Sequence, residues 1–346
     1  MIDLFRPLMN WKAADMVADT LSYKEGKCYI GEGPRVAEFE QRFARMVGVN
    51  KVLATNSGTS AIDLALHLCD VGPDDEVITT PMTCSATNGQ IITRGAIPIW
   101  ADVDPYTGLI EPNDVARKIT RGTKAIIGVD WGGKLCDYRA LKKFGVPVIQ
   151  DAAHSLLAGI GGDYVCWSFQ AIKHLTTGDG GALYTKQYDR ARLLRWYGLD
   201  RTKGESFRCS QNISEAGYKY HMNDIAATIG LANLECSRWA VNQHRRNAEF
   251  YGDQLGHDRP EPDSNSSWWL YTMLIENREG FIQHLADRDI VSSPVHTRND
   301  KHTGFSAPAQ HLPGVDYFSS RNVAIPVGWW LTEEDRKQIV EAVNTW

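Results

Sequence analysis

Lys173 is the residue whose surroundings first suggest chemistry. It lies in the stretch SFQAIKHLTTGDGGALYT, after the apolar run YVCWSF and before two threonines and a glycine-rich turn. A lysine at the rim of a buried strand can snorkel to water. If it is held away from water, its pKa falls and the neutral amine can form a Schiff base with a carbonyl group. The neighbouring motifs must decide between these two interpretations.

Asp151 ends an apolar run, VPVIQD, that is typical of a buried strand. A carboxylate at the end of such a strand has little water around it and needs a cationic or hydrogen-bonding partner. It can cap a helix, form a structural ion pair, or face a protonated nitrogen of a ligand. His154, which follows shortly after it, either faces the same pocket or is a hydrogen-bonded histidine of the core.

A helix start built from small residues lies earlier in the chain. In ATNSGTSAIDLALHLC, Ser57, Gly58 and Thr59 precede a run whose apolar residues share one helical face. Such a start presents unpaired backbone N–H groups and the positive end of the helix dipole, and hydroxyl groups add donors, which together favour a phosphate. The simpler interpretation is an ordinary Ser/Thr N-cap.

Together these features describe a site for pyridoxal 5'-phosphate (PLP). This cofactor requires a Schiff-base lysine, a carboxylate for its protonated pyridine nitrogen and a cradle for its phosphate. Gly178, Gly180 and Gly181 would permit close approach of the backbone beyond Lys173. The combination favours the functional interpretation of Lys173 and Asp151 over the structural one.

The elements that must position these residues alternate between helix and strand patterns over about the first 240 residues. In VAEFEQRFARMVG, one helical face carries Val36, Phe39, Phe43 and Met46. This alternation predicts an α/β fold on a mostly parallel sheet, with ligand sites at the carboxyl ends of the strands. The pattern changes near Asn242, so we expect a large domain over residues 1–240 and a smaller C-terminal α/β lobe over residues 241–346.

Composition narrows the class of protein. The 346 residues are 43% hydrophobic and 23% charged, with a net charge of −5 and dispersed basic residues, which is against a nucleic-acid partner. No apolar stretch is long enough for a membrane helix and the start lacks the pattern of a signal peptide, so we expect a cytoplasmic protein with no membrane association. The odd number of cysteines, seven without a C-x-x-C pair, indicates reduced thiols and no metal site.

Motifs spread over nearly the whole chain resemble the DegT/DnrJ/EryC1/StrS family of sugar aminotransferases, which are PLP enzymes of fold type I. They include YIGEGPRVAEFEQRFA, NSGTSAIDLAL, GPDDEVITTP, QDAAHS, SFQAIKHLTTGDGGAL, GYKYHMNDIAATIGLANL and SSRNVAIPV. The resemblance implies a seven-stranded, mostly parallel sheet in the large domain. It also implies that Lys173 binds PLP covalently, that Asp151 pairs with the ring nitrogen and that His154 lies near the phenolic oxygen. The residues that would hold the phosphate are Ser57, Gly58, Thr59 and Ser168.

Two positions depart from the pattern of the family. Where the family places an aromatic residue over the pyridine ring, TTPMTCSATN has Cys84 and one residue fewer. Where the family reaches the phosphate of the neighbouring subunit through an asparagine, GYKYHM has His221, which would act as a protonated anion partner. Lys219 is a rival for that role. The shared site implies a homodimer.

The resemblance also implies the reaction. Glutamate or glutamine would give its amino group to PLP, forming pyridoxamine phosphate, and a nucleotide-diphosphate-linked keto-deoxy sugar would receive it at C3 or C4, with ping-pong kinetics. Such amino sugars serve O-antigen, surface-polysaccharide or related syntheses. The substrate-facing loops would contribute Gly31, His296, Arg298 and Asn299. Arg298 can meet a diphosphate or remain solvated, and the pairs Trp268-Trp269 and Trp329-Trp330 fit a core or interface better than a nucleobase platform.

Two other functions are compatible with this fold. One is a PLP-dependent sugar dehydratase, in which histidine replaces the Schiff-base lysine, and the presence of Lys173 is against it. The other is a catalytically idle protein that binds a nucleotide sugar or a protein partner. The presence of both Asp151 and Lys173 is against that alternative.

Overall fold

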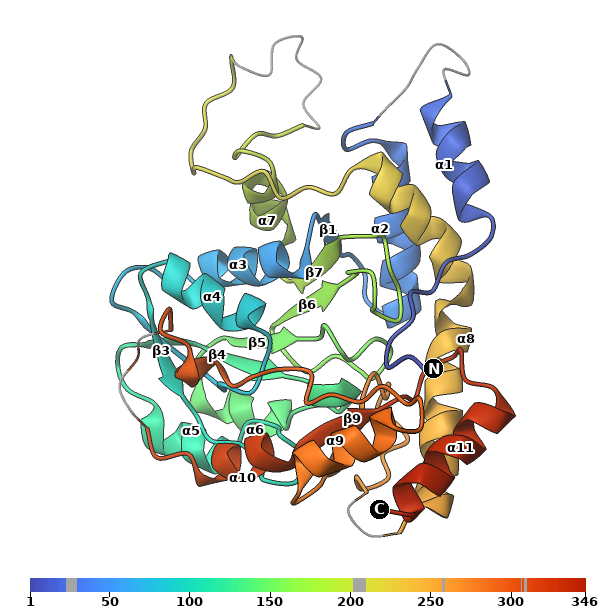
Figure 1. Cartoon of the computed structure of the whole chain (residues 1–346). Helices are drawn as coiled ribbons and strands as arrows, with labels where there is room; N and C mark the ends of the chain where they lie inside the picture. The colour runs from blue at the N-terminus through green and yellow to red at the C-terminus, as the bar shows by residue number, and fades with distance from the viewer. Residues whose placement is uncertain (23–29, 202–209, 257–258, 306, 308–309) are drawn as a thin grey trace.

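A seven-stranded sheet forms the centre of the protein, whose computed structural model describes residues 1–22, 30–201, 210–256, 259–305, 307 and 310–346 (Figure 1). The strand order is β1-β7-β6-β5-β4-β2-β3. Strands β2 to β6 are parallel, whereas β7 is antiparallel to β1 and β6. The strands are β1 (Leu53–Thr55), β2 (Glu76–Thr79), β3 (Ile97–Trp100), β4 (Thr123–Val129), β5 (Val148–Asp151), β6 (Tyr164–Ser168) and β7 (Gly181–Thr185). The expected α/β fold with a mostly parallel seven-stranded sheet is confirmed.

Both faces of the sheet are buried, which explains the nearly continuous apolar runs in its central strands. In β4, Ile127 packs in the same core cluster as residues of α3, whereas the neighbouring Ile126 belongs to a second cluster with residues of α10. The apolar face expected of α2 is confirmed, with Val36, Phe39 and Phe43 buried. The helices of the large part of the chain are α1 (Ala13–Leu21), α2 (Pro34–Val47), α3 (Gly58–Leu68), α4 (Ser85–Thr93), α5 (Pro112–Lys118), α6 (Tyr138–Leu141) and α7 (Tyr188–Arg195).

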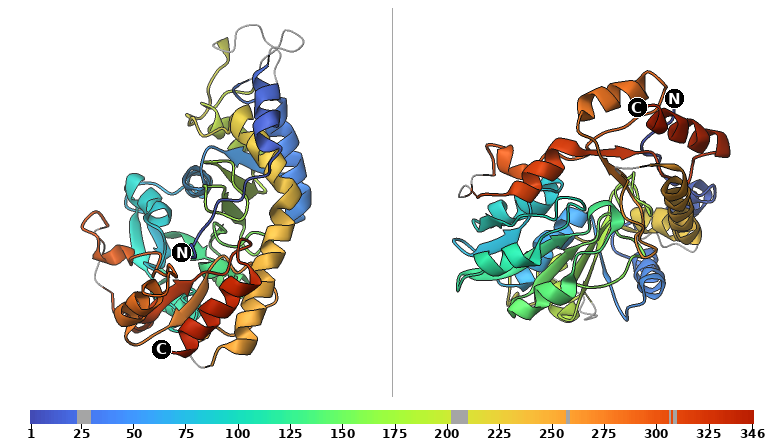
Figure 2. Two further views of the ribbon diagram at one scale, coloured as in Figure 1. Left: turned by 45° about the vertical axis from the view of Figure 1, so that its right-hand side comes forward. Right: turned by 90° about the horizontal axis from the view of Figure 1, so that it is seen from below.

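The long helix α8 (Asp224–Gln254) joins the two parts of the chain. Its N-cap is Asn223, whose side chain accepts a hydrogen bond of 2.9 Å from the backbone N–H of Ala226. The first half of α8 lies alongside α1 and α2, and its far end reaches the C-terminal elements (Figures 1 and 2). The domain boundary expected at residue 240 therefore falls inside a continuous helix.

The C-terminal elements gather at one end of the molecule (Figure 2). They are β8 (Tyr271–Leu274), α9 (Arg278–Ala286), α10 (Pro313–Arg321), β9 (Asn322–Ile325) and α11 (Glu333–Asn344), with β8 and β9 antiparallel. The N-terminal segment joins this lobe, because Ile2 pairs with Ile290 and is buried in the same apolar cluster. Ile2 thus packs with the C-terminal elements, whereas Leu4 is buried in a cluster with residues of the central sheet.

Membrane-spanning helices and the state of the cysteines can both be checked in the structure. Across the described ranges, no helix combines the length and the apolar character that crossing a bilayer requires. Cys28 and Cys209 lie outside the described residues. The other cysteines are free thiols: Cys69, Cys84, Cys136, Cys166 and Cys236.

Candidate active site

A cavity of about 690 Å³ lies at the carboxyl ends of β4, β5 and β6, beside the start of α3. The N-terminal segment and the C-terminal lobe also line it, through Phe5 and Trp269 respectively. The cavity brings together nine residues expected from the sequence: Ser57, Gly58, Thr59, Cys84, Asp151, His154, Ser168, Lys173 and His296. Its position agrees with the rule that ligands of parallel sheets bind outside the carboxyl ends of the strands.

Asp151 is the last residue of β5 and is 5% exposed. Its Oδ2 accepts a hydrogen bond of 2.7 Å from the hydroxyl of Thr87, and its Oδ1 accepts one of 3.1 Å from the N–H of Ala153. Thr87 is in turn 2.8 Å from the hydroxyl of Thr83. Burial raises the pKa of Asp151 above its usual value, while the donors from Thr87 and Ala153 oppose the rise. Burying the ionised carboxylate costs free energy, and a cation bound in the cavity would offset that cost.

Lys173 lies in the turn between β6 and β7, where its backbone N–H donates to the carbonyl of Gln170 over 2.9 Å. Its Nζ enters the cavity and lies 3.5 Å from the centre of the Trp269 ring. Burial lowers the pKa of Lys173 to about 7, against a smaller opposing effect of Asp151. A large share of the amine is therefore neutral and nucleophilic near pH 7. This position is not that of a lysine that snorkels to the surface.

The start of α3 is packed closely against the end of β6. Ser57 is the N-cap of α3, and its Oγ accepts a hydrogen bond of 3.0 Å from the N–H of Ser60. A Cβ at Gly58 would lie 2.8 Å from the Cβ of Ser168, so this position has room only for glycine. Capping and anion binding are compatible here, because a cap leaves other N–H groups of the first turn directed at the cavity.

Two neutral histidines line the cavity. His154 is 5% exposed, and burial holds its pKa well below the usual range, while burial lowers the pKa of His296 to about 4. Their rings are nearly parallel, with centroids 5.7 Å apart. Nδ1 of His154 and Nε2 of His296 are buried and have no hydrogen-bond partner within the described residues. Both rings therefore offer a free nitrogen that a bound ligand can satisfy.

Cys84 is exposed at the cavity and occupies the N-cap position of α4, where its side chain makes no capping hydrogen bond. The structure thus places a thiol in the wall of the cavity. Its role over a bound ring remains a prediction.

The remaining expected substrate residues lie outside the lining of this cavity. Arg298 is engaged by two carboxylates, Asp300 at 2.7 Å and Asp316. Asn299 is buried and donates a hydrogen bond of 2.9 Å to the carbonyl of Thr83, which ties its loop to the segment before α4. Gly31 is exposed, and its carbonyl accepts from the N–H at the start of α8. Contact of any of these three with a substrate remains a prediction.

His221 lies on the strand-like segment that pairs with Thr55 at the end of β1. Its ring lies 3.6 Å from that of Trp196, and its pKa falls to about 4, first through burial and then through the charge of Lys219. Burial therefore favours the neutral imidazole at pH 7 in the single chain. A role of His221 as an anion partner remains a prediction. The ammonium group of Lys219 lies 5.0 Å from the centre of the Trp196 ring.

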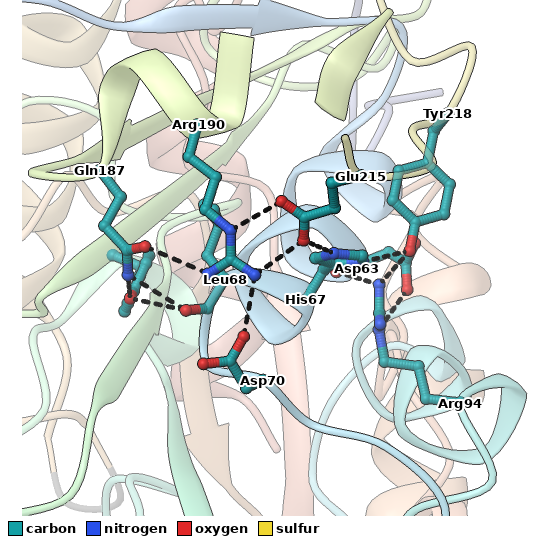
Figure 3. Close-up of polar contacts among 10 residues, drawn as sticks. Asp63, His67, Leu68, Asp70, Arg94, Gln187, Arg190, Glu215 and Tyr218 are labelled. Carbon is teal, nitrogen blue, oxygen red and sulfur yellow. Dashed lines mark hydrogen bonds and ion pairs between the residues drawn. The ribbon is translucent and has the colours of Figure 1, made fainter. Parts of the chain in front are cut away.

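The segment that leads to His221 is held to the large domain by a network of charged and aromatic groups (Figure 3). Nε2 of His67 on α3 lies 2.8 Å from Glu215, and Nδ1 lies 2.7 Å from the hydroxyl of Tyr218. Arg190 on α7 donates two hydrogen bonds to the carboxylate of Glu215, and Arg94, the C-cap residue of α4, donates to the hydroxyl of Tyr218. The network therefore fixes this segment against three helices.

A sequence profile of the DegT/DnrJ/EryC1/StrS aminotransferase family matches residues 12–344. The chain belongs to the DegT/DnrJ/EryC1/StrS aminotransferase family. As a member of this family, the protein is a PLP-dependent transferase of fold type I.

Individual relatives of this DegT/DnrJ/EryC1/StrS protein agree with the profile. The structure of the sugar aminotransferase CalS13 from Micromonospora echinospora is 34% identical, with a TM-score of 0.93 and coverage of 100% of both chains. The dTDP-4-dehydro-2,3,6-trideoxy-D-glucose 4-aminotransferase of Saccharopolyspora spinosa is 32% identical over 94% of this chain and 92% of its own. Spr1654 from Streptococcus pneumoniae, solved in its PLP form, is 26% identical over 99% of this chain and 98% of its own, with a TM-score of 0.88.

The cavity of this DegT/DnrJ/EryC1/StrS protein fits PLP. The ring nitrogen of PLP requires a carboxylate, which Asp151 supplies from a buried position. Its aldehyde requires an amine, which Lys173 supplies with a lowered pKa. Its phosphate requires a helix start with free backbone N–H groups, and at Gly58 this start has no room for a side chain. The unpartnered Nδ1 of His154 offers a further contact for a polar group of the ring.

Three further residues contribute to this site, and no motif in the sequence marks them. Thr87 holds Asp151, whereas Phe5 and Trp269 form part of the wall. Trp269 is indeed buried, as expected for a core residue, but its ring also contacts Lys173. The only local signal was the pair of tryptophans itself, and it does not distinguish a cavity wall from any other part of a core.

Proposed function

We propose that the protein transfers the amino group of glutamate or glutamine to a keto-deoxy sugar linked to a nucleoside diphosphate, at C3 or C4 of the sugar, in two successive half-reactions. The observation that carries the proposal is the amine of Lys173, which has a pKa near 7 and shares one cavity with the buried carboxylate of Asp151. Family membership and the activity named for the Saccharopolyspora spinosa relative support a sugar as the acceptor.

When bound, PLP supplies the electron sink for a carbanion at the carbon that loses a proton. Lys173 would anchor the cofactor and, when its amine is free, would hold or give up a proton at Nζ beside the reacting carbon. Asp151 would keep a proton on the pyridine nitrogen. The first turn of α3, with Thr59 and Ser168 nearby, would hold the phosphate.

The neutral histidines of the cavity add hydrogen bonds without charge. His154 would contact the phenolic oxygen of the cofactor, and His296 would contact the substrate. Because burial keeps both imidazoles neutral near pH 7, neither adds positive charge beside Lys173. We infer that this keeps the released amine able to accept a proton.

We also propose that two copies of the chain form a homodimer with shared active sites. His221 or Lys219 would reach the phosphate in the partner's site, because neither residue lines the cavity of its own chain. The network around Glu215 supports this arrangement, since it holds the segment that carries both residues rigidly in place.

The test combines peptide mapping with a substrate panel. Borohydride reduction of the purified protein is expected to leave a phosphopyridoxyl group on the peptide of Lys173, and Lys173→Ala is expected to abolish it. Lys186→Ala is a matched control, because Lys186 is an exposed lysine just beyond β7. With glutamate and GDP-, UDP- and dTDP-linked keto sugars, mass spectrometry is expected to find one aminated sugar. Label on another lysine, or no aminated sugar from any donor and acceptor, would contradict the proposal.

A further inference from the structure

Trp269 makes two separate contacts with the segment that contains Lys173. Its ring centre lies 3.5 Å from Nζ of Lys173, and its Nε1 donates a hydrogen bond of 3.1 Å to the carbonyl of Ile172. Trp269 belongs to the segment between α8 and β8, far from Lys173 in sequence. The C-terminal lobe thus provides the surface on which the side chain of Lys173 rests.

The indole ring of Trp269 is itself fixed. It is 3% exposed and lies in a stack with Phe5, at 4.9 Å and 20°, and with His154, at 3.9 Å and 25°. Phe5 comes from the N-terminal segment and His154 from the loop after β5. Because Phe5, His154 and the carbonyl of Ile172 all contact the ring, its orientation beside Lys173 is fixed by packing and by a hydrogen bond.

Other groups face Lys173 less directly. Asp151 and Cys84 favour its protonated form through charge, but Lys173 makes no ion pair within the described ranges of the chain. The neighbouring imidazoles are His154, His174 and His296, and burial keeps all three neutral near pH 7. The indole is therefore a direct contact that favours the ammonium form, through the negative face of its ring.

We propose that Trp269 is a positioning residue for Lys173, whose free ε-amino group it holds against the indole face between covalent attachment and proton transfer. This rests on the proposed function, in which Lys173 is repeatedly released. A released lysine has a long flexible side chain. Holding its amino group in one place reduces the conformational entropy that is lost when the amine meets the reacting atom. The same contact makes the protonated fraction of the amine larger than it would be in apolar surroundings alone.

The test measures the pKa of Lys173 in cofactor-free protein. Competitive labelling with acetic anhydride, from about pH 5 to about pH 10, gives the pKa from mass spectrometry of the Lys173 peptide. Trp269→Leu is expected to lower this pKa by about one unit, a tenfold change in the protonated fraction. Trp269→Phe keeps an aromatic face and is expected to recover most of the difference. Trp268→Leu, at the adjacent tryptophan that stacks on Tyr271, is the matched control and is expected to leave it unchanged.

A second measurement avoids any change of side-chain shape. Replacing all 11 tryptophans with fluorinated tryptophan weakens the negative ring face, and the pKa of Lys173 is expected to fall with each added fluorine. An unchanged pKa in Trp269→Leu or in the fluorinated series overturns the proposal and leaves Trp269 as a packing residue. Neither measurement uses a substrate, so failure of the sugar panel and failure of this inference are separate results.

Discussion

The hydrogen bond from Thr87 to Asp151 offers a quantitative test of how the site works. Thr87→Val keeps the shape of the side chain but removes the donor that lies 2.7 Å from Oδ2 of Asp151. Asp151 is 5% exposed, so water cannot easily replace that donor. A hydrogen bond to a charged group contributes roughly 1.5–3 kcal/mol, so we expect the pKa of Asp151, already raised by burial, to rise by about one to two further units.

This rise changes where the proton between Asp151 and a pyridine nitrogen resides. A more basic carboxyl group would take the proton, so the ring nitrogen of a bound cofactor would lose its charge and the ring would accept electrons less well. The same free energy corresponds to a loss of about 10- to 150-fold in kcat. Thr87→Ser retains the hydroxyl and is expected to restore most of the activity.

The assay is steady-state turnover across pH, with PLP occupancy measured by absorbance in each variant. Thr83→Val is a matched control, since the hydroxyl of Thr83 lies 2.8 Å from that of Thr87, and the hydrogen bonds to the Asp151 carboxylate within the described residues come from Thr87 and Ala153. It is expected to lower kcat less than Thr87→Val does. If Thr87→Val turns over within about twofold of the wild type at full PLP occupancy, the hydrogen bond does not set the charge state of Asp151 and the reasoning fails.

Three further predictions concern the carboxylate, the shared site and the network. Asp151→Asn is expected to keep the fold and bind PLP but to lose most turnover, and near-normal kcat would refute its role. Mixing Lys173→Ala subunits with His221→Ala subunits is expected to restore part of the activity, provided that each variant is nearly inactive alone, and no recovery after verified subunit exchange would exclude His221. The hydrogen bonds of Arg190 and His67 lower the pKa of Glu215 to about 2, below its unfolded value of roughly 4.3. Its stabilising effect is therefore present above pH 4.3 and lost toward pH 2, so urea midpoints of wild type and Glu215→Gln should converge on acidification, and a constant difference would contradict this.

Much of the site follows from local sequence patterns. An apolar run that ends in Asp151 places this carboxylate at the end of a strand, and small residues at Ser57 and Gly58 start a helix whose first N–H groups are unpaired. In a parallel sheet these ends share one edge, so residues far apart in the chain converge without any knowledge of packing. The family motifs then identified Lys173 among the other lysines.

Long-range packing decided what the sequence left open. Trp269 reached Lys173, and Phe5 reached Trp269, because the N-terminal segment and the C-terminal lobe pack together over the cavity. Arg298 paired with Asp300 and Asp316 instead of remaining solvated. His221 packed at a tilt against Trp196, and its burial lowered its pKa. None of these contacts has a periodicity or a fixed spacing in the chain. They depend on which surfaces bury each other, and burial then sets the charge state of each group, so only the tertiary structure could decide them.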